Sequence, residues 1–294
     1  MKVYALLVMS MLLWGGTWVA GRIVARTIPP WDAAFLRFLM GSVCLVTMCL
    51  ASGGIKLLVP KRHHLLPLLL LGATGIFGYS TLFFRGLKTI EAGRAALIVG
   101  FAPSSIALAS AVFLRERLSA MAVGGILLAF GGVGVVMSNG DIGTLLARGV
   151  AVGDLMIVGC VICWTAYTLI GRQVMRDLAP LVVVTWSCMI GTVMLFPLAL
   201  HSGILHNTQG WSAGAWIGLV YLGPFATSLA YYWYYDAVSR IGSVRSAIFI
   251  NLVPVFALLL GALLLGETLS GALLIGGGMV MAGVYVTVLW KSTR

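Results

Sequence analysis

Long apolar runs alternate with short polar segments along nearly the whole chain. Ten runs can be drawn, each close to the roughly 20 residues that an α-helix needs to cross a bilayer. They are continuously apolar, whereas the strands of a membrane β-barrel would be about ten residues long and alternate in polarity. The pattern predicts an all-α integral membrane protein with ten transmembrane helices. The expected helices cover residues 3–21, 32–51, 65–84, 93–113, 120–138, 151–170, 180–200, 212–235, 244–264 and 270–290.

Composition excludes the soluble classes of protein. Apolar residues make up 61% of the 294 residues and charged residues 9%, against about 25% charged in a soluble domain. The residues outside the runs are enough only for the connections and tails, so they cannot form a folded soluble domain. A soluble enzyme, a receptor ectodomain and a DNA-binding protein are therefore excluded. The net charge of +11 fits basic residues in short loops. We therefore expect the lipid bilayer as a partner and no nucleic acid.

The chain repeats itself at a nearly constant spacing. Residues 14–22 and 164–172 share the pattern Trp-x6-Gly-Arg, 150 positions apart. Residues 116–119, Glu-Arg-Leu-Ser, return as Glu-Thr-Leu-Ser at 267–270, 151 positions later. One alignment in register covers almost the whole chain, which indicates an internal duplication.

Each copy contains five expected spans, and this odd number has a topological consequence. The second copy must enter the membrane from the opposite side, so residues 1–139 and 140–294 form two inverted five-helix repeats. Inverted repeats are typical of alternating-access transporters, whose substrate site lies near the midplane between the repeats. The distribution of Lys and Arg, most biased in the second half, predicts a multi-pass protein of the bacterial inner (plasma) membrane with both termini cytoplasmic.

Several segments carry a resemblance to a known family. They are Leu13-Trp14-Gly15-Gly16, Phe35-Leu36-Arg37-Phe38, and the endings of the two halves at 102–103 with 114–119 and 253–254 with 265–270. Together they resemble the drug/metabolite transporter superfamily, in particular its EamA-domain family. The resemblance implies ten helices, cytoplasmic termini and alternating access around a central cavity. The aromatic-rich interior is similar to the YddG-type amino-acid exporters.

Aromatic residues deep in the spans are candidates for lining the substrate cavity. Trp14 and Trp18 share one face of the first span, because residues four apart are neighbours on a helix. Trp164 is the repeat counterpart of Trp14. Core packing and cavity lining are both open for such residues. The expected lining is Trp14, Trp18, Tyr79, Phe83, Gly100, Trp164, Tyr167, Tyr231 and Asn251.

Two prolines fall in the middle of expected spans at equivalent positions. Pro103 and Pro254 each remove a backbone hydrogen bond, so each is either a packing kink or a hinge that lines the cavity. Gly100 and Asn251 lie three residues before them. The Asn251 amide either bonds a neighbouring helix or binds substrate.

Three arginines could contact a substrate carboxylate or form a gate. Arg37 lies inside the second span, where it either snorkels outward or faces the cavity and meets a carboxylate. Arg94 and Arg245 are repeat counterparts, and each is either a gate residue or a helix-end charge that sets topology.

No buried carboxylate occupies the middle of any expected span, so coupling to protons through such a group is disfavoured. We expect an exporter of small neutral or zwitterionic metabolites, foremost amino acids that include aromatic and apolar ones, for which a monomer suffices. A same-fold transporter of a drug, sugar or nucleoside, and a membrane protein without transport activity, remain alternatives. No catalytic residue, metal or cofactor is expected, because the spans hold no nucleophile–base pair and the four histidines fall in two loops on opposite sides.

Overall fold

The chain folds into a bundle of membrane-length helices. The computed structural model describes residues 2–53, 59–115, 117–141, 150–241 and 249–291, and none of these residues forms a strand. Nine of the helices in this part of the chain are long and apolar enough to cross a membrane, and a tenth apolar helix is shorter. The prediction of an all-α integral membrane protein is confirmed.

The first half contains five spans. They are α1 (Lys2–Thr27); α2 (Pro30–Gly53); α3 (Leu65–Leu71), η3 (Gly72–Gly78) and α4 (Tyr79–Leu87) in series; α5 (Ala92–Val99) followed by α6 (Ala102–Phe113); and α7 (Ala120–Ser138). A short turn, η2 (Arg62–His64), precedes α3.

The second half follows the same order. Its spans are α9 (Val152–Val174); α10 (Pro180–His201); α12 (Ala213–Val220), η5 (Tyr221–Leu229) and α13 (Ala230–Ile241) in series; α15 (Leu252–Leu265); and α16 (Gly271–Lys291). Two short turns, α11 (Ile204–Asn207) and η4 (Thr208–Gly210), connect α10 to α12. The expected start of the ninth span, near residue 244, lies outside the described residues.

Local sequence signals explain where several helices begin and end. The Ser119 hydroxyl accepts a hydrogen bond from the Ala122 N–H at 3.1 Å and caps the start of α7. Asn139 ends that helix in the left-handed conformation, with φ of 50°. At the start of α12, Ser212 accepts from the Ala215 N–H in the same way.

The third and eighth spans each contain a stretch of π-helix. These stretches, η3 and η5, occupy corresponding positions, since Gly72 and Gly223 lie 151 residues apart. Pro224 contributes to η5 because it has no N–H to donate. Such wide turns often occur at functional sites, and the apolar pattern alone did not predict them.

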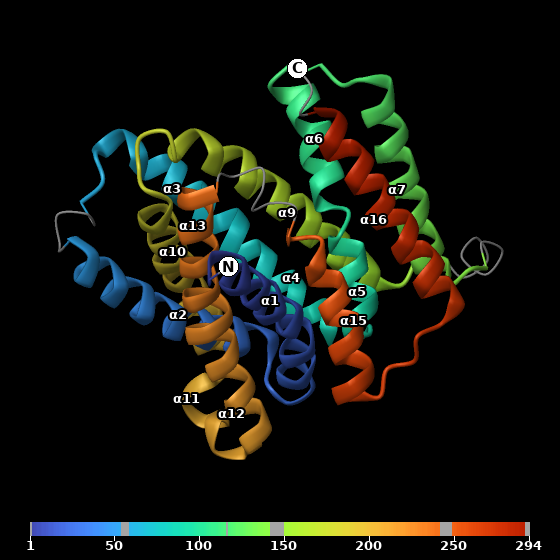
Figure 1. The fold of residues 1–294 in the computed structure, drawn as a ribbon. Helices are drawn as coiled ribbons and strands as arrows, with labels where there is room; N and C mark the ends of the chain where they lie inside the picture. Colours follow the sequence, from blue (N-terminus) through green and yellow to red (C-terminus); the bar gives the residue numbers. More distant parts are fainter. Residues whose placement is uncertain (1, 54–58, 116, 142–149, 242–248, 292–294) are drawn as a thin grey trace.

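Equivalent helices of the two halves run antiparallel against each other. In α7 and α16, which lie side by side (Figure 1), Gly125 faces Gly283 and Gly132 faces Gly276. Because Gly125 corresponds to Gly276 and Gly132 to Gly283, the two contacts are related by a pseudo-two-fold axis. The backbones approach so closely that a Cβ on Gly132 would lie 2.6 Å from the Gly276 carbonyl oxygen.

Helices α2 and α10 show the same relation. The hydroxyls of Ser42 and Thr192, at equivalent positions, are 3.3 Å apart. Two turns further along, Cys49 Sγ lies 3.3 Å from Thr185 Oγ1, so the two helices cross antiparallel. These contacts give the fold its two inverted repeats; the boundary between residues 139 and 140 stays a prediction.

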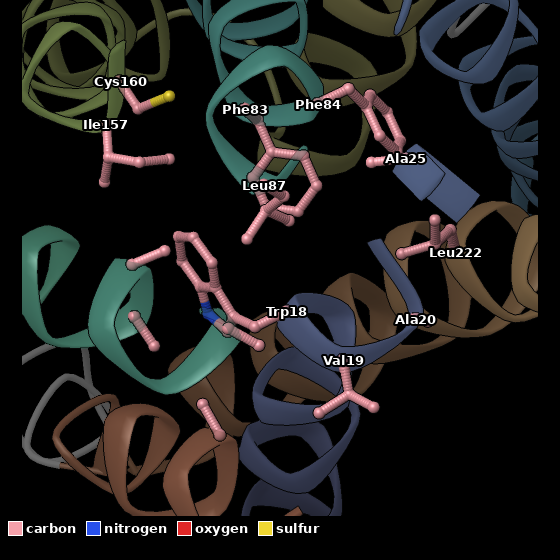
Figure 2. Close-up of a cluster of buried hydrophobic side chains, with 14 of the residues drawn as sticks. Trp18, Val19, Ala20, Ala25, Phe83, Phe84, Leu87, Ile157, Cys160 and Leu222 are labelled. Carbon is pink, nitrogen blue, oxygen red and sulfur yellow. The ribbon is translucent and has the colours of Figure 1, made fainter. Parts of the chain in front are cut away.

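The first span packs mainly against helices of the second half, and the sixth span packs mainly against helices of the first half. Helix α1 packs against α15 and α13, whereas α9 packs against the corresponding α6 and α4. Figure 2 shows a buried core to which both helices contribute side chains, with Trp18 of α1 directed toward Phe83 and Leu87 of α4. Ile157 and Cys160 of α9 enter the same core from its other side.

The glycine contact between α7 and α16 can be tested by adding one methyl group. We expect Gly132→Ala to destabilise the protein by about 1–3 kcal/mol, because the new Cβ collides with backbone that cannot move aside. The melting temperature of the purified protein in detergent should fall by several degrees. Gly134→Ala on the same helix is the matched control, since a Cβ there meets nothing within 4 Å. Equal melting temperatures for the two variants would contradict the packing described.

Candidate functional site

One aromatic cluster joins the third and sixth spans. Tyr79 of α4 lies 5.8 Å from the Trp164 ring of α9, and Trp164 stacks on Tyr167 at 5.4 Å. All three side chains are half-buried. The structure therefore brings together three of the expected lining residues on facing helices.

A second cluster joins the first and eighth spans at the equivalent place. Trp14 of α1 lies 5.2 Å from the rings of both Tyr231 and Tyr234 of α13. Its indole N–H donates a hydrogen bond to the Ala226 carbonyl oxygen in η5, at 3.0 Å. Trp14 and Trp164 are repeat counterparts and α13 corresponds to α4, so the pseudo-two-fold axis relates the two tryptophans and their partner helices, whereas Tyr79 and Tyr231 are not at equivalent positions. Tyr234 was not among the expected lining residues.

Trp18 and Phe83 lie beside these clusters but deeper in the core. Their rings are 5.2 Å apart, and Phe83 stacks on Tyr79 at 6.0 Å. Only 4% of Trp18 and 1% of Phe83 is exposed. Figure 2 shows both side chains within the buried hydrophobic cluster. In this conformation Trp18 and Phe83 belong to the buried core, and Phe83 contacts the aromatic site through the Tyr79 ring.

The fourth and ninth spans are interrupted where the prolines fall. Helix α5 ends at Val99 and α6 begins at Ala102, so Pro103 is the second residue of a new helix. Pro254 is the third residue of α15. The sequence predicted that each proline would remove a backbone hydrogen bond in the middle of a span. The structure corrects this, because the first N–H groups of a helix have no partner within it and both prolines lie there. Both prolines instead mark the start of a half-helix.

The two interruptions lie next to each other. A Cβ on Gly100 would be 3.4 Å from Pro254 Cγ, so the break in the fourth span contacts the start of α15. Asn251 occupies the N-cap position of α15, yet its side chain makes no capping hydrogen bond. No other hydrogen bond holds this amide among the residues that the structure describes, and the side chain is half-buried. The Asn251 amide is thus available at the break.

Arg37 points into the bundle instead of snorkelling to its surface. Only 9% of the residue is exposed, and its Nε and Nη1 atoms are buried without a hydrogen-bond partner in the described part of the chain. The guanidinium carbon lies 5.0 Å from the Phe38 ring centroid and 5.5 Å from that of Phe83. Tyr79 and Tyr231, one from each aromatic cluster, lie within its electrostatic reach.

Arg94 forms a charged connection between the halves. Its Nε and Nη2 donate to the two carboxylate oxygens of Asp154 at 2.8 and 2.5 Å, and Nη2 also donates to the Met137 carbonyl oxygen at 2.7 Å. Asp154, in the first turn of α9, is fully buried. Arg245, the counterpart of Arg94, lies outside the described residues.

Glu267 makes a second connection that the sequence analysis did not identify. Its carboxylate accepts hydrogen bonds from the N–H groups of Ala92 at 2.9 Å and Gly93 at 3.0 Å, at the start of α5. Arg22 of α1 lies 3.3 Å from the same group. With 7% of its side chain exposed, Glu267 ties the α15–α16 loop to two helices of the first half.

Glycines around Glu267 carry the signal that could have revealed it. A Cβ on Gly261 would lie 2.7 Å from Glu267 Oε2, so only glycine leaves room for the carboxylate. Glu267 belongs to the repeated loop motif Glu-x-Leu-Ser, and Gly93 and Gly261 both face its carboxylate. This combination is the sequence signal for a carboxylate that is buried against the start of a helix. This end of the bundle is therefore fastened by two charged contacts between the halves, Glu267 with Arg22 and α5, and Asp154 with Arg94.

A separate cluster of polar side chains lies at the start of the third span. His63, His64 and Asp177 offer ligand atoms that all lie within 4.8 Å of one another. His64 Nε2 is 3.6 Å from Asp177 Oδ2. The structure thus groups two loops that the sequence analysis had not connected, away from the aromatic clusters.

Comparison with known proteins agrees with this architecture. The fold and its duplicated half-sites define a membrane transporter, and the model of the EamA-like transporter family matches residues 1–138 and again residues 151–289. The chain therefore belongs to the EamA-like transporter family, which confirms the resemblance seen in the sequence.

Individual relatives are distant but cover most of the chain. The uncharacterized transporter YyaM of Bacillus subtilis is 28% identical over 88% of this chain and 85% of its own. The aromatic amino acid exporter YddG of Ancylobacter novellus is 29% identical over 85% of this chain and 84% of its own. A solved crystal structure with 24% identity has a TM-score of 0.66 and covers 98% of both chains, which agrees with the fold.

The ion pair between Arg94 and Asp154 yields a prediction about stability. We expect Asp154→Asn to cost about 3 kcal/mol, because it leaves the mostly buried Arg94 without its counter-charge. Asp177→Asn is the control, since 64% of the Asp177 side chain is exposed and surface ion pairs contribute only about 0–1 kcal/mol. Thermal unfolding of the purified variants should separate the two. A melting temperature for Asp154→Asn equal to that of the control would argue against a stabilising connection.

Proposed function

We propose that this protein is a transporter rather than an enzyme, and that it exports small neutral or zwitterionic metabolites. Amino acids, including aromatic and apolar ones, are the substrates we favour. The proposal places the protein in the bacterial inner membrane with both termini in the cytoplasm. A single chain contains both repeats, so a monomer suffices for the mechanism.

The pair of aromatic clusters is the observation that carries this proposal. Trp14 with Tyr231, and Trp164 with Tyr79, present half-buried ring faces from four helices around the middle of the bundle. Ring faces bind apolar and aromatic side chains through burial and edge-to-face contact. The neighbouring Asn251 amide, the last turn of α5 and the first turn of α15 offer polar groups for the substrate backbone. The exporter YddG, a relative, adds support for the substrate class.

Alternating access would use the charged contacts at one end of the bundle. Glu267 and Asp154 hold the halves together there, so in this conformation that end is closed. Opening it requires the carboxylates to leave Arg22, Arg94 and the start of α5. The interrupted helices beside the aromatic site, α5–α6 and α15, are the elements that can absorb such a change.

Exchange of labelled solute across proteoliposomes tests the proposal. Vesicles that contain the protein and unlabelled L-phenylalanine should accumulate trace labelled L-phenylalanine, and similar vesicles should accumulate threonine or methionine. We expect Trp164→Ala and Asn251→Ala to slow this counterflow by about tenfold, because each removes a contact worth about 1–3 kcal/mol. Trp216→Ala, which alters a tryptophan of α12 outside both clusters, should exchange at the wild-type rate.

Failure of the wild-type protein to exchange any amino acid would overturn the substrate assignment. The same vesicles loaded with a sugar, a nucleoside or a lipophilic drug would then identify which alternative substrate this fold carries.

The position of the acidic residues leads to a prediction about energy coupling. Asp32 and Asp154 lie in the first turns of α2 and α9, where Ser202 and Arg94 engage them. Because these carboxylates hold helices together, we expect transport to follow the solute gradient without proton movement. Uptake driven by a substrate gradient should therefore continue after an uncoupler collapses the pH gradient. Loss of uptake under the uncoupler, with the solute gradient intact, would contradict this mechanism.

A further inference from the structure

Arg37 differs from the other buried arginines of the described spans in having no counter-charge. Asp154 pairs with Arg94, Glu267 with Arg22, and Asp32 accepts a hydrogen bond from the Ser202 hydroxyl. Around Arg37 no carboxylate lies within 4.0 Å among the residues that the structure describes, and Nε and Nη1 lack any hydrogen bond there. Burial of an unpaired charge within a membrane bundle is costly, and residues that bear it are usually functional.

The surroundings of Arg37 place it between the two aromatic clusters. Its guanidinium faces the rings of Phe38 and Phe83, and Phe83 stacks on Tyr79 of the first cluster. Tyr231, of the second cluster, also lies within electrostatic reach of the guanidinium. A planar donor of several N–H groups is thus fixed beside ring faces that suit an apolar side chain.

We infer that Arg37 binds the carboxylate of the transported substrate. This inference rests on the proposed function and deepens it: the site recognises a carboxylate beside an apolar or aromatic body, so a carboxylate that lacks the ammonium group of an amino acid should bind as well. Guanidinium and carboxylate match in a bidentate arrangement that a point charge such as Lys does not reproduce. The positive charge also excludes cationic amines, so the site discriminates by charge as well as by shape.

The same arrangement suits transport as well as binding. When the substrate enters, its carboxylate supplies the missing counter-charge inside the bundle, and when it leaves, the guanidinium returns to its unpaired state. Because part of the binding free energy offsets the burial of Arg37, the substrate is held selectively without being held tightly.

Competition with matched analogues tests the inference. Labelled L-phenylalanine is exchanged in proteoliposomes against unlabelled L-phenylalanine, 3-phenylpropanoate, which keeps only the carboxylate, or L-phenylalaninamide, which keeps only the ammonium group. We expect the first two to compete and the amide to require at least about tenfold higher concentration. Arg37→Met should slow exchange at least about tenfold, and Arg37→Lys should restore it only in part.

Thermal unfolding separates a binding role from a structural one. Without ligand, Arg37→Met should melt no lower than the wild type, because an unpaired charge is replaced by an apolar side chain of similar length. L-phenylalanine and 3-phenylpropanoate should raise the melting temperature of the wild type and leave that of Arg37→Met unchanged. The control is Arg85→Met, which removes an exposed arginine that contacts the Trp31 ring and should behave as wild type in both assays.

The outcomes distinguish this inference from the proposed function. Exchange in which the amide competes as well as L-phenylalanine, or in which Arg37→Met is as fast as wild type, overturns the role of Arg37 and leaves amino-acid export in place. Absence of any wild-type exchange overturns amino-acid export. If, in addition, neither carboxylate shifts the wild-type melting temperature, the Arg37 site is overturned as well.

Discussion

Every polar group within lipid must find its partner inside the protein, and this constraint shapes the whole structure. It makes each span helical, because a helix satisfies its own backbone. It also explains why many Ser and Thr hydroxyls donate to a carbonyl one turn earlier, as Thr165 does to Val161 at 2.8 Å. At the buried start of α5, the free N–H groups of Ala92 and Gly93 receive the carboxylate of Glu267 from another part of the chain. Arg37 stands out among the buried arginines because, within the described part of the chain, its Nε and Nη1 lack a partner and no carboxylate faces it.

The sequence was sufficient to predict the spans and the inverted repeat, because both depend on long-range regularities. The apolar run over residues 120–138 coincides with α7, since it lies between a Ser cap and an Asn that adopts the left-handed conformation. Gly125 and Gly132 recur as Gly276 and Gly283 at the repeat spacing of 151, and the antiparallel contact of α7 with α16 uses all four. Equivalent positions in a duplicated chain constrain each other, which is why these features could be derived.

The orientation of side chains and the contacts between residues far apart in the chain were harder to derive from one sequence. The pattern placed Arg37 inside a span but left its direction open, and only the rotation of α2 against α4 turns it inward. Glu267 looked like an ordinary loop acid, because its partners Arg22 and Ala92 are far away in sequence. The π-helical stretches η3 and η5 differ from an α-helix by a single extra residue per turn, which no apolar periodicity resolves. The prolines showed where the helices are interrupted but not that each begins a new helix.

The glycine contact between α7 and α16 has a mechanical consequence. Where backbone touches backbone there are no side-chain rotamers to rearrange, so the two helices can turn against each other only slightly before atoms collide. One of them belongs to each half, so in the alternating access that we propose the pair would serve as the pivot. The larger displacements fall on interfaces that side chains mediate, namely the aromatic clusters and the charged end. If the halves tilt about this contact, the distance from the contact to either end of the bundle would determine how wide the opening at that end becomes.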